Sequence, residues 1–174
     1  MSKNINILNL FFEEPNREFN VREIARILKI SPTTASKELK VLAKKEILKW
    51  RKERIFDLYK ANLDNEKYLD AKKFYNINKL KSSGLIEELN KFYLKPVIVL
   101  FGSYAYGLDT ETSDIDILVI SEKTIGFKNL KKFEIKLKKK IQMFNAKNIK
   151  DLKNKELINN IINGIIIQGK IKWI

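Results

Sequence analysis

Residues 96–120 constrain this chain more than any other segment, because two short apolar runs flank a turn and a pair of aspartates. The first run is Pro96–Phe101 and the second is Ile115–Ile120. Short runs of β-branched and apolar residues bounded by turn residues are typical of buried strands. Gly102-Ser103 ends the first run, and Asp114-Ile115-Asp116 begins the second. The pattern therefore predicts two buried strands joined through the segment 102–114.

The two aspartates are expected to project from one face of the second strand, because side chains alternate along a strand. Two carboxylates in this arrangement repel each other unless a cation lies between them, and paired oxygen ligands suit Mg²⁺. At the preceding turn, glycine lets backbone amides approach an anion closely. A simple Ser-Asp turn or cap at Ser113-Asp114 is the alternative interpretation.

The spacing of Gly-Ser, ten residues and Asp-x-Asp resembles the signature of the DNA polymerase β-like nucleotidyltransferases, especially their small minimal members. The likeness covers residues 96–174. It implies an α/β (α+β) domain with a mixed sheet and flanking helices. It also implies a nucleoside triphosphate substrate, for which we expect ATP, and Mg²⁺ or Mn²⁺ as cofactor. Members of this family modify nucleic acids, small molecules and proteins, and some act on a partner toxin as antitoxins.

The same resemblance assigns roles to residues of the turn and the second strand. Asp114 and Asp116 are the expected catalytic and metal-binding residues. The expected nucleotide-binding residues are Gly102, Ser103 and Tyr104. The side chains of Tyr104 and Tyr106 either stack on the base or simply pack in the domain.

The chain departs from the family pattern at the third acid. In the family, a carboxylate on a later strand helps to activate the attacking hydroxyl. Here the expected strand is Ile141–Phe144, and Gln142 stands where that acid would be. An amide carries no charge for a metal and cannot act as a base. Asp151 is the nearby substitute, or it caps a helix before Leu152, so catalysis by this site stays open.

The N-terminal part predicts helices followed by a hairpin. Apolar residues recur at helical spacing from Ile5 to Phe12 and again from Val21 to Ile30. Ser31 is a good N-cap and Pro32 suits the first position of a third helix, which we expect to run to Lys45. Two strands, Ile47–Arg51 and Arg54–Tyr59, are expected to be joined through Lys52-Glu53.

This order resembles the winged helix-turn-helix domains of prokaryotic transcriptional regulators over residues 19–62. The resemblance implies binding of double-stranded DNA, with the third helix in the major groove. The expected contacts are Thr33, Thr34, Ser36, Lys37 and Lys40 on that helix, and Lys49, Arg51, Lys52 and Arg54 on the wing. A solvated polar helix face and a protein-pairing module are the alternatives. We expect a homodimer, because one winged helix reads one half-site.

Composition narrows the chemistry and the setting. The 174 residues include no Cys and no His, which excludes disulfides, thiolate metal sites and histidine-based catalysis. The formal net charge of +14 favours a polyanionic partner. We find neither an apolar run long enough to span a membrane nor a signal peptide, so we expect no membrane partner and a cytoplasmic protein.

The remaining segments complete the predicted organisation. We expect a winged helix-turn-helix domain over 1–62, a connecting helix over 63–83 and a nucleotidyltransferase domain over 84–174. A lysine-rich helix over 127–140 either is solvated or guides an acidic partner. A last helix ends near Gly164, followed by strands at Ile165–Ile167 and Ile171–Ile174. Two functions compete: a DNA-tethered nucleotidyltransferase, and an inactive nucleotide-sensing transcriptional regulator.

Overall fold

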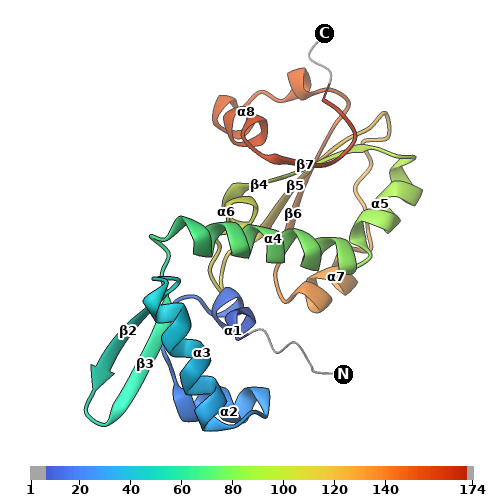
Figure 1. Cartoon of the computed structure of the whole chain (residues 1–174). Helices are drawn as coiled ribbons and strands as arrows, with labels where there is room; N and C mark the ends of the chain where they lie inside the picture. The colour runs from blue at the N-terminus through green and yellow to red at the C-terminus, as the bar shows by residue number, and fades with distance from the viewer. Residues whose placement is uncertain (1–6, 172–174) are drawn as a thin grey trace. The chain divides into compact units, whose positions relative to one another are not determined.

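The computed structural model describes residues 7–171, and the chain divides into two compact units at Lys72/Lys73 (Figure 1). Ile5 and the final part of the strand expected at Ile171–Ile174 lie outside the described residues. Helix α4, Glu66–Ser82, crosses the division, so the connecting helix expected over 63–83 is shared by both units. No helix within residues 7–171 is long and apolar enough to cross a membrane.

The N-terminal unit combines helices with a small antiparallel sheet. Its elements are α1 (Leu8–Glu13), β1 (Phe19–Asn20), α2 (Val21–Leu28), α3 (Pro32–Lys44), β2 (Leu48–Glu53) and β3 (Phe56–Ala61), with strand order β1-β3-β2. Side chains cap both helices of the α2–α3 pair, because Asn20 accepts from the Glu23 amide at 2.9 Å and Ser31 from the Thr34 amide at 3.0 Å. The predicted cap at Ser31 is thereby confirmed.

The turn of the hairpin lies two residues later than predicted. Glu53 pairs with Phe56, so Lys52 and Glu53 belong to β2 and the turn consists of Arg54 and Ile55. Arg54 adopts a left-handed conformation with φ 54°, which permits the tight reversal. The sequence prediction placed apolar Ile55 in a strand, whereas it is 84% exposed at the tip.

The C-terminal unit is built on a four-stranded mixed sheet. Its further elements are α5 (Leu85–Tyr93), β4 (Val97–Phe101), α6 (Gly102–Tyr106), β5 (Ile115–Ile120), α7 (Leu130–Leu137), β6 (Ile141–Ala146), η1 (Ile149–Asp151), α8 (Lys155–Ile162) and β7 (Ile165–Gln168). The strand order is β6-β5-β4-β7, with β5 and β6 parallel and the other pairs antiparallel. The predicted mixed sheet with flanking helices is confirmed for this unit.

Both faces of this sheet are covered, which explains the nearly continuous apolar runs of β4 and β5. One face packs Leu100 and Ile117 against residues of α5 and α7. The opposite face packs Phe101 and Leu118 against Ile161 of α8. Because Asp116 pairs with Phe101 in the antiparallel register, its side chain belongs to this second face.

Two local features differ from the sequence prediction. Helix α7 ends at Leu137 instead of Lys140, because Lys138 adopts a left-handed conformation with φ 57°. Gly164 follows α8, but it has no positive φ. A Cβ there would lie 2.7 Å from the carbonyl oxygen of Leu100, so close packing of β4 requires this glycine.

Candidate functional site

Asp114, just before β5, and Asp116, in β5, lie near the Gly-Ser turn that follows β4. Asp116 pairs with Phe101, the residue that precedes Gly102. A Cβ on Gly102 would be 3.2 Å from Cγ of Asp116 and still closer to its carboxylate oxygen. Gly102 also has φ +70°, which favours glycine. Glycine is therefore required here both by its own conformation and by the neighbouring carboxylate.

The electrostatics of this pair favour a bound cation. Burial raises the pKa of Asp116 above its ordinary value, and the negative charge of Asp114 raises it further. Both side chains are partly exposed. Among residues 7–171, neither carboxylate makes a hydrogen bond or ion pair with another residue. The two carboxylates therefore fit a divalent metal ion, which would remove their repulsion.

The turn places the expected phosphate-binding residues at the start of α6. Within the described chain, no side chain caps this helix start, and Ser103 is partly exposed. Tyr104 is 1% exposed, and its hydroxyl lies 3.4 Å from the carbonyl oxygen of Asn76. Stacking of the Tyr104 ring on a base is therefore wrong, because the ring belongs to the core. Tyr106 instead donates to the carbonyl oxygen of Asn163 at 2.9 Å.

The third acid is missing in space as well as in the sequence. Gln142 pairs with Asp116 across the parallel strands β5 and β6, and its side chain is exposed. Asp151 lies beyond the opposite end of β6, where its carboxylate accepts from the Asn148 amide at 2.8 Å in a capping box. Among residues 7–171, no further acid joins Asp114 and Asp116 in a three-ligand cluster. Asp151 is therefore a cap and not the substitute ligand.

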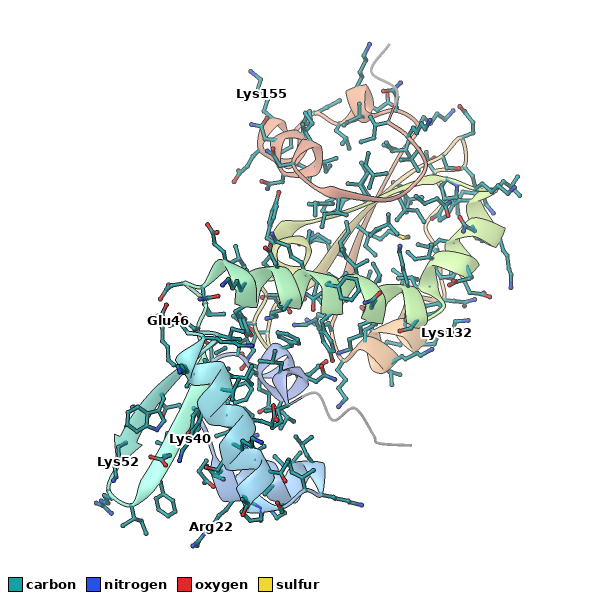
Figure 2. The ribbon with its side chains drawn as sticks, in the orientation of Figure 1. Arg22, Lys40, Glu46, Lys52, Lys132 and Lys155 are labelled. Carbon is teal, nitrogen blue, oxygen red and sulfur yellow. The ribbon has the colours of Figure 1, made fainter. Side chains whose placement is uncertain are left out.

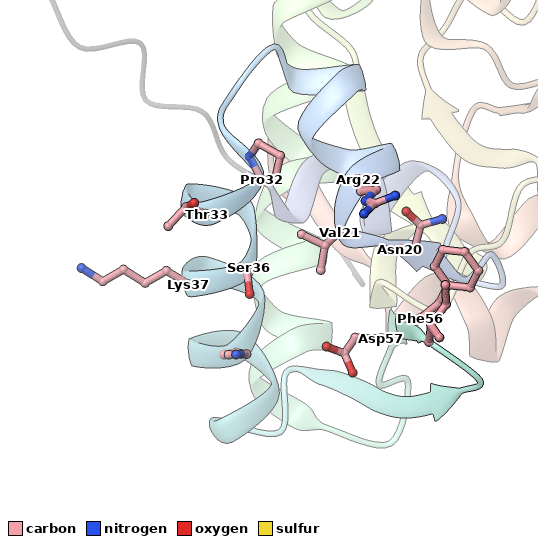
Figure 3. A pocket seen from close by; sticks show the side chains of 11 residues that line it. Asn20, Val21, Arg22, Pro32, Thr33, Ser36, Lys37, Phe56 and Asp57 are labelled. Atoms are coloured by element: carbon pink, nitrogen blue, oxygen red, sulfur yellow. The ribbon is translucent and has the colours of Figure 1, made fainter.

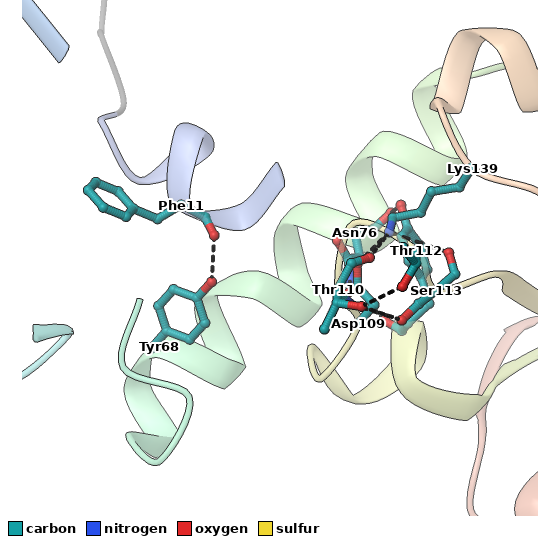
Figure 4. Close-up of polar contacts among 9 residues, drawn as sticks. Phe11, Tyr68, Asn76, Asp109, Thr110, Thr112, Ser113 and Lys139 are labelled. Carbon is teal, nitrogen blue, oxygen red and sulfur yellow. Dashed lines mark hydrogen bonds and ion pairs between the residues drawn. The ribbon is translucent and has the colours of Figure 1, made fainter. Parts of the chain in front are cut away.

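A buried polar network, which the sequence did not reveal, holds the loop before Asp114 (Figure 4). Lys139 Nζ lies 3.2 Å from the Asp109 carboxylate and 3.5 Å from the Ser113 carbonyl oxygen. Asn76 donates to the same carboxylate at 2.7 Å and to the Tyr104 carbonyl oxygen at 2.9 Å. The run of lysines suggested that Lys139 belongs to a solvated basic face. The structure instead directs Lys139 to the Asp109 carboxylate. No local sequence signal distinguishes it from the lysines on either side.

The N-terminal unit presents a groove between α3, the start of α2 and the hairpin (Figure 3). Its volume is about 680 Å³. The lining residues from α3 include Thr33, Ser36, Lys37 and Lys40, and those from the hairpin are Ile55, Phe56 and Asp57. Lys40 and Lys52 come from the helix and the hairpin, respectively (Figure 2). Four of the five residues predicted to contact DNA from α3 therefore lie along one groove, and the fifth, Thr34, is exposed near the cap.

The basic residues predicted on the hairpin divide into two groups. Arg51 makes a bidentate contact with Glu18 at 2.6 and 2.8 Å and a further ion pair with Glu53. This guanidinium lowers the pKa of Glu18. Lys49 pairs with Asp64 at 2.5 Å. Lys52 and Arg54 carry no ion pair with any residue in the described range, so they are the cations most available to a partner.

Residues 82–167 match the family model for the nucleotidyltransferase domain. A comparison with curated proteins found no match to the chain. The matched segment begins at the last residue of α4 and includes β4, β5, β6 and all of β7 except Gln168. Gly102, Asp114 and Asp116 lie within it. The C-terminal unit is therefore similar to a nucleotidyltransferase domain over these residues, and nucleotidyl transfer is the general activity that this match supports.

Removing the buried cation of the network should destabilise the protein. Lys139→Met removes an ion-pair partner from the Asp109 carboxylate, which is 2% exposed, and should lower the free energy of unfolding by about 3–5 kcal/mol. The double variant Lys139→Met/Asp109→Asn should recover part of this loss, because the carboxylate charge that Lys139 neutralised is removed as well. Denaturant unfolding measures both. The exposed neighbour Lys138→Met is the control, and equal midpoints for Lys138→Met and Lys139→Met would contradict the role of Lys139.

The raised pKa of Asp116 predicts a specific pH dependence. Because the pKa of Asp116 is raised in the folded protein, its carboxyl group contributes stability at a pH below 3.8, the ordinary pKa of this group. This contribution is lost as the pH rises through the raised pKa. Asp116→Asn should therefore melt at a higher temperature than the wild type at pH 7 without divalent metal, and this advantage should vanish in acid. Mn²⁺ should stabilise the wild type but not the variant. Glu122→Gln, an exposed acid, serves as the control, and no difference from it would refute the prediction.

Proposed function

We propose that the protein is a DNA-binding nucleotidyltransferase that transfers a nucleotidyl group from a nucleoside triphosphate to a hydroxyl acceptor. ATP is the substrate that we expect. The observation that carries this proposal is the Asp116 carboxylate beside Gly102, two residues from Asp114. Neither carboxylate makes a hydrogen bond or ion pair with any residue of 7–171. The domain match at residues 82–167 supports the same chemistry.

The residues of the site have distinct roles in this proposal. Asp114 and Asp116 hold Mg²⁺ or Mn²⁺, which when bound neutralises the charge on the phosphate oxygens. The Ser103 hydroxyl and the amides of Gly102 and Tyr104 orient the outer phosphates. Burial of Asp116 next to the turn keeps these two sets of groups adjacent, so that metal and phosphate are bound side by side.

The N-terminal unit supplies the DNA-binding part of the proposal, as a winged helix-turn-helix. The basic and hydroxylated face of α3 lines the groove, and exposed Lys52 and Arg54 lie at the end of the hairpin. Lys37, Lys40, Lys52 and Arg54 would contact phosphates, while Thr33, Thr34 and Ser36 would lie against base edges. Lys49 and Arg51 would have to exchange their carboxylate partners for phosphates. We expect a homodimer that binds two half-sites.

A second function is favoured by one specific observation, the pairing of Gln142 with Asp116. A site with an amide in this position retains two ligands for a metal–nucleotide complex but lacks a carboxylate to activate a hydroxyl. The alternative is therefore a nucleotide-sensing transcriptional regulator without catalysis. The two functions differ in whether pyrophosphate is released after the nucleotide has bound.

Nucleotidyl transfer can be tested directly with α-labelled ATP and Mg²⁺. The label should move to a hydroxyl acceptor of nucleic acid or protein, with release of pyrophosphate, and Asp114→Ala and Asp116→Ala should each abolish the transfer because the metal is no longer held. Glu122→Ala is the matched control. Binding of nucleotide without pyrophosphate, across both acceptor classes, would support the sensor instead. A protein acceptor would fit a partner toxin.

DNA binding should depend on the charge of α3. Lys37→Glu/Lys40→Glu should weaken binding of a fluorescent duplex by at least about tenfold and reduce the slope of affinity against salt, because phosphate contacts release counterions. Fluorescence anisotropy at several salt concentrations measures both. Lys153→Glu/Lys155→Glu changes the net charge equally in the C-terminal unit and should have a smaller effect. Equal losses for the two double variants would show that only net charge matters.

A further inference from the structure

The residues that enter β5 and β6 stand side by side at the candidate site. The Ile115 amide donates to the carbonyl oxygen of Lys140 at 2.9 Å, and Ile115 pairs with Ile141. Lys140 therefore precedes β6 beside Asp114, as Gln142 lies beside Asp116. The neighbour of each carboxylate, Lys140 just before β6 or Gln142 in it, is not an acid.

Lys140 differs from the lysine before it. Lys139 is directed inward to the Asp109 carboxylate, whereas Lys140 is exposed and makes no ion pair with the residues that the structure describes. Its ammonium is a compact charge on a flexible four-carbon stem, and its backbone is hydrogen-bonded to Ile115, the residue after Asp114. The groups that meet here are Asp114, just before β5, and Asp116 in it, with Lys140, just before β6, and Gln142 in it.

This set of groups limits the number of metal ions that the site can hold. Two cations about 4 Å apart in a phosphoryl-transfer site need anionic oxygen ligands for each of them. The present site has two carboxylates, and the amide of Gln142 adds no negative charge. The ammonium of Lys140 repels a further cation on the β6 side and attracts phosphate oxygens.

We propose that this site takes up a single divalent cation together with the triphosphate, and that Lys140 supplies the remaining positive charge. The inference rests on the proposed nucleotide binding and specifies its composition. In this inference Lys140 binds the phosphates of the nucleotide. Gln142 prevents the binding of a second metal ion, because it offers no carboxylate ligand. The metal would be shared by Asp114 and Asp116.

The number of bound ions can be counted with Mn²⁺, whose free form has a distinct electron paramagnetic resonance signal. The full chain is titrated with Mn²⁺ at a saturating concentration of a non-hydrolysable ATP analogue. The wild type should bind one ion per chain, and Gln142→Glu should bind two, because the new carboxylate completes a second set of ligands. Asn78→Asp, an amide-to-acid change at an exposed position of α4, should still bind one.

The role of Lys140 is tested by nucleotide affinity at fixed Mn²⁺. Lys140→Met should weaken binding of the analogue by about two- to fivefold, the range of one exposed ion pair. Lys155→Met, which removes an exposed lysine of α8, should leave the affinity unchanged. An equal affinity for Lys140→Met and the wild type would overturn the assignment of Lys140.

Failure of this inference can be told apart from failure of the proposed function. Two bound Mn²⁺ ions in the wild type, or one in Gln142→Glu, would overturn the single-metal site while nucleotide binding stands. A wild-type chain that binds neither Mn²⁺ nor the analogue would overturn both. Circular dichroism of each variant confirms that it is folded before the ions are counted.

Discussion

The packing of the Asp116 carboxylate against the bare backbone of Gly102 is the contact on which the candidate site depends. It joins the end of β4 to the start of β5, and it exists because the antiparallel register sets Asp116 opposite Phe101. The same contact withdraws the carboxylate from water beside a second negative charge, which raises its pKa. The pairing of β4 with β5 therefore gives the candidate site an electrostatic environment that suits a cation.

A second constraint acts on the loop between these strands. Residues 107–114 form no helix or strand, so their polar groups need partners elsewhere. Lys139 and Asn76 provide them through the Asp109 carboxylate, from segments on either side of the loop in the sequence. Buried charges of this kind are costly unless they are paired, and a complete network fixes one arrangement of the chain. Asp114 is held in place by this arrangement at the end of the loop.

Charge is used differently in the two units. In the C-terminal unit Lys139 is paired with Asp109 inside the domain. Asp114 and Asp116 make no hydrogen bond or ion pair with any residue of 7–171. In the N-terminal unit the carboxylates of Glu18, Glu53 and Asp64 engage Arg51 and Lys49. Lys37 and Lys40 of α3 and Lys52 and Arg54 of the hairpin make no ion pair within residues 7–171, and all four are exposed. The formal charge of +14 is thus less informative than the identity of the residues that stay unpaired. The unpaired cations of α3 and the hairpin would complement a polyanion. The carboxylates of Asp114 and Asp116 would complement the metal ion of a metal–nucleotide complex.

The sequence by itself determined the local features of this protein. The Ser31 cap, the strands β4 and β5, and the common face of Asp114 and Asp116 follow from capping chemistry and from the alternation of side chains along a strand, which involve only neighbouring residues. The tertiary structure decided which distant residues meet. The pairing of Gln142 with Asp116, the inward course of Lys139 and the burial of the Tyr104 ring all depend on the register and packing of segments far apart in the chain. Strand pairing and core packing are cooperative properties of the whole domain, and no short stretch of sequence encodes them alone.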